Sequence, residues 1–82
     1  MAPSKFVSPV FKLGTYKHYK GDIYEAVMIA MDEATLTWSV VYKPLYDHTG
    51  MPDYWIRSVD IFSETIEFDG KPIKRFTLLD SN

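Results

Sequence analysis

An alternation of apolar and polar side chains over residues 36–42 is the clearest regularity in this chain of 82 residues. The apolar members fall at every second position: Leu36, Trp38, Val40 and Tyr42. Thr37 and Ser39 lie between them. Successive side chains of a strand point to opposite faces, so this period of two predicts a strand with one face toward a core.

The segment Ile23–Met31, just before this strand, is ambiguous by composition alone, because its Ala, Met and Glu residues also permit a helix. A short polar stretch, residues 32–35, separates it from the alternating strand. A strand, a short polar turn and a second strand form a hairpin, and we therefore expect Ile23–Met31 to be the first arm of that hairpin. A further strand is expected over Gly14–Lys20, where Thr and Tyr are frequent.

The connection over residues 43–53 contains Pro44, Gly50 and Pro52, which interrupt regular structure. Tyr54–Arg57 then has high strand propensity. Residues 58–62 suit a single helical turn, because a serine at position 58 can cap it and an aspartate at position 60 favours its positive N-terminal end.

A last hairpin is predicted near the end of the chain. Residues 65–68 alternate, with Ile66 and Phe68 expected to face inward and Glu67 outward. Asp69-Gly70 is typical of a type I′ turn, in which both central residues need positive φ. The segment Ile73–Leu79 would then return antiparallel.

These elements predict an all-β fold of five to six short antiparallel strands, with a one-turn helix before the last hairpin. A sheet this small has exposed edges unless it closes on itself. We expect a small SH3-like barrel, and a five-stranded OB-like barrel is the competing closure.

The domain organisation follows from the breakers near the start. Residues 1–13 form an expected N-terminal arm, interrupted by Pro3, Ser4, Ser8 and Pro9. Phe6, Val7, Val10 and Phe11 make it too apolar for a free tail, so part of it should lie against the domain. Residues 14–79 form the domain, and residues 80–82 a polar tail.

Composition narrows the classes of function. The chain has no cysteine, which excludes disulfides, thiolate metal sites and thiol nucleophiles. The net charge is −2, although the four basic side chains of residues 1–20, all lysines, have no acidic neighbour within that segment. No apolar run approaches the length of a membrane span, and no secretory signal is visible, so we expect a cytoplasmic protein without membrane partners.

Several separated motifs resemble the DUF1653 family. They are Gly14–Gly21 with Tyr24-Glu25, Val41–Tyr46, Trp55-Ile56-Arg57, Phe62, Glu67, Asp69–Lys71 and Arg75-Phe76, in the order and spacing of that family. The resemblance covers about residues 14–79 and implies a small SH3-type barrel in a bacterial protein, with no established activity. Ser58 stands where the family usually has proline, Val59-Asp60 replaces a frequent Leu-Glu, and the loop 47–53 is longer than usual.

The sequence offers little support for catalysis. Its serine, histidine and aspartate residues lack the sequence context of a catalytic triad. His18 and His48 are thirty residues apart without nearby metal-ligand partners, and the four glycines form no phosphate-binding loop. We therefore expect no cofactor and no metal, and favour a binding or accessory module over an enzyme.

Eight aromatic and basic residues form the candidate binding face: Tyr16, Lys17, His18, Tyr19, Lys20, Tyr24, Trp55 and Arg57. Aromatic rings stack on bases, contributing about 1–3 kcal/mol each, and cations hold phosphates. The same face suits a peptide or a small anionic ligand. Aromatic residues also supply core volume in a small domain, so the three cations are the more informative positions.

Two alternatives of other classes stay open. His18 and Arg57 are candidates for an enzyme or a small-molecule-binding protein, unless Arg57 forms a structural ion pair with Glu67 or Glu25. The apolar arm is a candidate for self-association into a homodimer.

Overall fold

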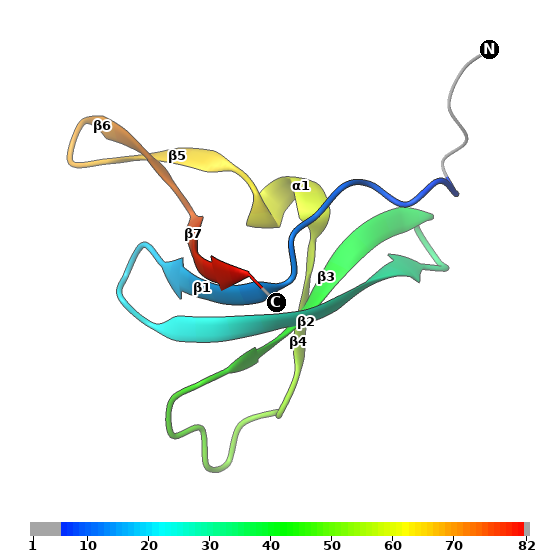
Figure 1. Cartoon of the computed structure of the whole chain (residues 1–82), viewed down its shortest axis with the longest axis horizontal. Helices are drawn as coiled ribbons and strands as arrows, with labels where there is room; N and C mark the ends of the chain where they lie inside the picture. Colours follow the sequence, from blue (N-terminus) through cyan, green and yellow to red (C-terminus); the bar gives the residue numbers. More distant parts are fainter. Residues whose placement is uncertain (1–5, 82) are drawn as a thin grey trace.

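The computed structural model describes residues 6–81, which form seven strands and one short helix (Figure 1). In chain order these are β1 Gly14–His18, β2 Ile23–Asp32, β3 Thr37–Pro44, β4 Trp55–Ser58, α1 Val59–Phe62, β5 Thr65–Phe68, β6 Lys71–Lys74 and β7 Phe76–Ser81. Five strands form one antiparallel sheet in the order β4-β3-β2-β1-β7, and β5 pairs with β6 in a separate hairpin. The all-β class and the one-turn helix before the last hairpin are confirmed.

The main sheet is curved but does not close into the expected barrel. Within residues 6–81 its edge strands, β4 and β7, do not pair with each other. The chain leaves β4 directly into α1, and the next strand, β5, pairs with β6 instead of returning to the sheet. Side chains bridge the opening, since the Arg57 guanidinium carbon lies 5.7 Å from the ring centre of Phe76.

The described strands outnumber the five or six expected because the segment 73–79 is divided at Arg75. Before this residue, β6 pairs with β5, and after it β7 pairs with β1. The Arg75 N–H donates to the Glu64 carbonyl (2.9 Å), and its carbonyl accepts from the Tyr19 N–H (2.9 Å). The backbone of Arg75 thus stays hydrogen-bonded where the chain passes from pairing with β5 to pairing with β1. The local pattern of residues gives no sign of this change.

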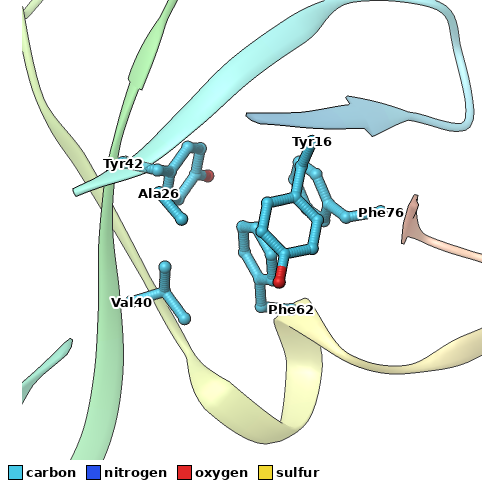
Figure 2. Close-up of a cluster of buried hydrophobic side chains, with 6 residues drawn as sticks. All are labelled: Tyr16, Ala26, Val40, Tyr42, Phe62 and Phe76. Carbon is cyan, nitrogen blue, oxygen red and sulfur yellow. The ribbon is translucent and has the colours of Figure 1, made fainter. Parts of the chain in front are cut away.

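The core lies between the concave side of the sheet and α1 (Figure 2). Its buried members are Tyr16, Ala26, Val40, Tyr42, Phe62 and Phe76. The rings of Phe62 and Phe76 stack with their centres 4.0 Å apart. Although α1 is only one turn long, it delivers the most buried aromatic side chain, Phe62, which is 1% exposed.

Most of the local predictions are confirmed. β2 and β3 form the expected hairpin. The Ile61 N–H donates to the Ser58 hydroxyl (3.2 Å), which is the predicted cap. Asp69 and Gly70 both have positive φ, 53° and 76°, as a type I′ turn requires.

Three expectations about which side chains are buried are wrong. Leu36 belongs to the turn before β3, has a φ of 55° and is exposed, so it does not continue the buried face of Val40. Phe68 is 48% exposed instead of inward, because β5 and β6 lie outside the main sheet. Ser39, expected on the outer face, is buried at the point where β3 pairs with β4.

Part of the N-terminal arm lies against the core. The Phe11 ring centre is 5.8 Å from that of Tyr16 and 5.5 Å from that of Phe62. In Figure 1 this segment passes beside α1 before entering β1. Pro3, Ser4 and Asn82 lie outside the described residues, and the boundary of the arm at residue 13 stays a prediction. No helix among the described residues is long and apolar enough to cross a membrane.

Candidate functional site

Strand β1 divides the predicted face between two sides of the sheet. Tyr16 is a core residue, 8% exposed, and its hydroxyl donates to the Lys12 carbonyl (2.5 Å). Burial raises the pKa of Tyr16. Lys17 is exposed and lies on the opposite side from Tyr16 and His18, because strand side chains alternate. Tyr16, which is buried, and Lys17, which lies on the other side of the sheet, are therefore separated from the rest of the predicted face.

His18 is the centre of a row of rings at the end of β1. Its ring centre lies 4.5 Å from that of Tyr19, 6.4 Å from that of Tyr24 and 4.9 Å from that of Phe76. The Lys20 ammonium lies 5.8 Å from the centre of the Tyr19 ring. The structure thus brings together four of the eight residues of the candidate face: His18, Tyr19, Lys20 and Tyr24.

Trp55 and Arg57 lie on β4, the edge strand that pairs with β3. They pair with Tyr42 and Val40, respectively, so they share the concave side with these buried residues. A shallow hollow of about 210 Å³ lies in front of them. Its lining residues are Tyr24, Tyr42, Tyr46, Met51, Trp55 and Arg57.

The loop after β3 completes the hollow. The hydroxyls of Tyr24 and Tyr46 lie 3.1 Å apart and share a hydrogen bond. This bond and burial raise the pKa of Tyr24, with burial the larger cause. The Tyr24 phenol therefore stays protonated near neutral pH and presents a neutral ring with a polarised edge.

Arg57 has no acidic partner within residues 6–81. Its Nε donates to the Tyr42 hydroxyl (3.4 Å), and its guanidinium lies against the Phe76 ring. The alternative ion pairs are not formed: Glu25 pairs with Lys43 (3.9 Å), and Glu67 is exposed on β5. A guanidinium carries five N–H donors, so Arg57 retains donors that a ligand can use.

The charge around His18 is positive. Burial lowers the pKa of His18, and the charges of Arg57, Lys20 and Arg75 lower it further against a smaller opposing effect of Asp22. Arg75 is neutralised by Glu64, at 2.7 Å between Nη2 and Oε1. Among the described residues, Arg57 and Lys20 are therefore the cations beside the neutral imidazole that no carboxylate pairs.

The proton of neutral His18 can be placed from its hydrogen bond. The Lys20 N–H donates to His18 Nδ1 (3.2 Å), so Nδ1 is the acceptor nitrogen. This assigns the ring proton to Nε2, which is then a donor. A neutral histidine beside two cations can therefore donate to an anion as well.

Sequence reasoning missed Tyr46, Met51 and Phe76 as neighbours of this face. Tyr46 and Met51 lie in the loop between β3 and β4, and only folding brings this loop beside Tyr24. Phe76 is 3% exposed, and its ring packs against the side chains of Arg57 and His18. Its adjacency to Arg75 in the sequence gave no indication of that role.

No metal site emerges from the described part of the chain, where no three His, Asp or Glu side chains are grouped closely enough to hold an ion. The site is defined by rings and by unpaired cations. These features define a small all-β domain with an open sheet and a concave face of aromatic and basic residues.

The chain belongs to the DUF1653 family, whose description is a protein of unknown function, and the family model matches residues 14–78. The resemblance predicted from the sequence is confirmed. The chain is similar to a crystal structure of a DUF1653 protein from Bordetella bronchiseptica, with 36% identity and a TM-score of 0.77 over 84% of this chain and 87% of that one. No curated protein matches. Membership therefore establishes the fold and leaves the function open.

Proposed function

We propose that this domain is a non-catalytic binding module, in a bacterial cytoplasm, for the ring and phosphate of a nucleotide. The observation that carries the proposal is Arg57, a half-buried cation without an acidic partner in residues 6–81, at the edge of a hollow lined by tyrosines and Trp55. A flat ring against the aromatic residues and an anion at Arg57 would satisfy both parts of the site.

The size of the hollow supports a single ring as its occupant. Sites that enclose a whole small molecule measure about 300–1,000 Å³, and this hollow has about 210 Å³. One base would fill it, and the attached phosphate would lie outside, within reach of Arg57 and the Nε2–H of His18. Stacking contributes about 1–3 kcal/mol per base.

The charge of the chain sets the expected strength. A net charge of −2 gives no long-range attraction for a polyanion. The attraction is local, from Arg57 and Lys20, and we expect modest affinity that falls as salt rises.

The experiment is a backbone amide NMR titration at low salt with two ligands, uridine monophosphate and a short mixed-sequence single-stranded RNA. We expect localised shifts at His18–Lys20, Tyr24 and Trp55–Arg57 with at least one of them. Binding of both with similar affinity would identify the nucleotide as the ligand, and much tighter binding of the RNA would identify a single strand.

Two matched variants distinguish a contact at the proposed site from a general effect of the protein's charge on binding. Arg57→Gln should weaken binding by about tenfold, because it removes one charge-assisted contact. Lys17→Gln removes the same charge from the opposite side of the sheet and should leave affinity nearly unchanged. Absence of localised shifts at millimolar ligand, or an equal effect of the two variants, would contradict the proposal and direct the search to peptides.

A further inference from the structure

A second hollow lies away from the binding face. It has a volume of about 370 Å³ and lies between the N-terminal arm, α1 and the β6–β7 segment. Its apolar lining includes Phe11, Tyr16, Phe62, Phe76 and Leu78. Of the eight residues predicted as a binding face, only Tyr16 lines it.

The floor of this hollow is aromatic and offers little polarity. Phe62 and Phe76 are almost fully buried, stack face to face and lie beside Tyr16 (Figure 2). The Tyr16 hydroxyl is already bonded to the Lys12 carbonyl. A ligand over this floor would therefore gain apolar contact, and any polar group that it carries would have to be placed at the rim.

The rim is positively charged. Lys12 and Lys74 are among the lining residues, and no Asp or Glu is. Both lysines are exposed, and neither forms an ion pair with a carboxylate of residues 6–81. Their flexible four-carbon stems allow both ammonium groups to reach the mouth of the hollow.

We propose that this hollow is a second site, beyond the proposed nucleotide-binding function, for a small amphipathic carboxylate such as a medium-chain aliphatic acid. The apolar chain would lie against the half-buried Phe11 and Leu78, above the buried rings of the floor, and the carboxylate would meet Lys12 and Lys74. The volume lies at the lower end of the range of about 300–1,000 Å³ that is typical of small-molecule sites. Phe11 and Lys12 precede the family match, which begins at Gly14, so the site depends on the arm of this chain.

The test is an amide NMR titration of the full chain with octanoate and, separately, with octanol, which has the same chain length and no charge. We expect octanoate to shift the amides of Lys12, Ser63 and Thr77. It should bind about five- to tenfold more tightly than octanol, because two partly exposed charge contacts are gained.

Two double variants with the same change of charge serve as test and control. Lys12→Gln with Lys74→Gln should reduce octanoate affinity to that of octanol. Lys17→Gln with Lys71→Gln removes two exposed lysines that do not line the hollow, and should leave affinity within about twofold. Equal affinity for octanoate and octanol, an equal effect of the control pair, or shifts only at Trp55–Arg57 would overturn the proposal.

Discussion

At the scale of single residues, the two histidines show how surroundings separate identical side chains. Burial and neighbouring cations lower the pKa of His18. His48 lies in the loop between β3 and β4, with its Nδ1 2.9 Å from the Tyr46 carbonyl and its Nε2 3.2 Å from Asp53 Oδ1. Hydrogen bonding to Tyr46 and the nearby Asp53 carboxylate raise the pKa of His48. The Tyr46 carbonyl and the Asp53 carboxylate can both accept a hydrogen bond from the ring only when both of its nitrogens carry protons.

An NMR pH titration of the two imidazoles checks this difference. We expect His48 to titrate above its ordinary pKa of about 6.5 and His18 below it. The stabilisation from protonated His48 is then complete below pH 6.5 and disappears as pH rises through its folded-state pKa. Neutral His18 has the opposite effect, because protonation in the unfolded chain lowers stability as pH falls below 6.5. Equal pKa values for both rings would contradict the assigned environments.

The same titration reports on the proposed binding face. A bound phosphate near Arg57 would favour protonated His18 and partly offset the neighbouring cations. We therefore expect saturating uridine monophosphate to raise the pKa of His18 and to leave that of His48 unchanged. A rise at His48 alone would place the anion at the loop and contradict the proposed site.

At the scale of elements, α1 is too short to be stable by itself. An isolated helix of one turn does not repay the cost of nucleation, so its stability comes from its cap and from packing. Ser58 accepts the Ile61 N–H, and Phe62 anchors the turn in the core. The cap therefore helps to stabilise the turn that carries Phe62 into the core.

Substitution of the cap tests this dependence. Ser58→Ala should lower the free energy of unfolding by about 0.5–2 kcal/mol, the usual cost of losing a serine cap. Ser8→Ala is the control, because Ser8 is exposed in the arm and, among residues 6–81, its hydroxyl donates only to the adjacent Pro9 carbonyl. Both values come from urea unfolding followed by circular dichroism. A loss for Ser58→Ala no larger than for the control would show that Phe62 alone holds α1.

At the scale of the whole molecule, an open sheet must be sealed by side chains where a closed barrel would use backbone bonds. Phe62 and Phe76 occupy the space between α1 and the sheet, and the Arg57 side chain crosses to Phe76. Stability therefore depends on a few large rings instead of on continuous strand pairing.

The central ring pair is tested by truncation. Phe62→Ala should cost about 3–5 kcal/mol, the range for deletion of a fully buried phenylalanine. Phe68→Ala removes a ring that is 48% exposed on the β5–β6 hairpin and should cost well under half as much. Urea unfolding provides the comparison, and similar losses would mean that the hairpin contributes as much to the core as α1.

The arm provides a second test at this scale. Phe11→Ala should lower stability by about 1–3 kcal/mol, because its half-buried ring packs on Tyr16 and Phe62. Val10→Ala, at a fully exposed neighbour, should have little effect on stability. Sedimentation of both variants checks for self-association. A dimer that only Phe11→Ala dissociates would show that the arm docks between copies instead of within one chain.

The pattern of neighbouring residues was enough to predict those elements that short-range interactions stabilise. The hairpin β2–β3, the cap at Ser58 and the Asp69-Gly70 turn each follow from neighbouring residues. The face of Phe68 was assigned incorrectly, because alternation shows that two sides differ but not which side meets another layer. His18 and Tyr24, both members of the candidate face, do lie close together, since β1 and β2 are adjacent in sequence and in the sheet.

The sequence by itself therefore determined the all-β class, the turns, the helix cap and the family. Tertiary structure alone decided the open sheet and the change of strand partners at Arg75. It also decided that Tyr16 is in the core, that Arg57 lacks an acidic partner among the described residues, and that Tyr46 completes the hollow. The physical reason is range: turns and caps depend on residues a few positions apart, whereas burial and charge pairing depend on segments that meet only after folding.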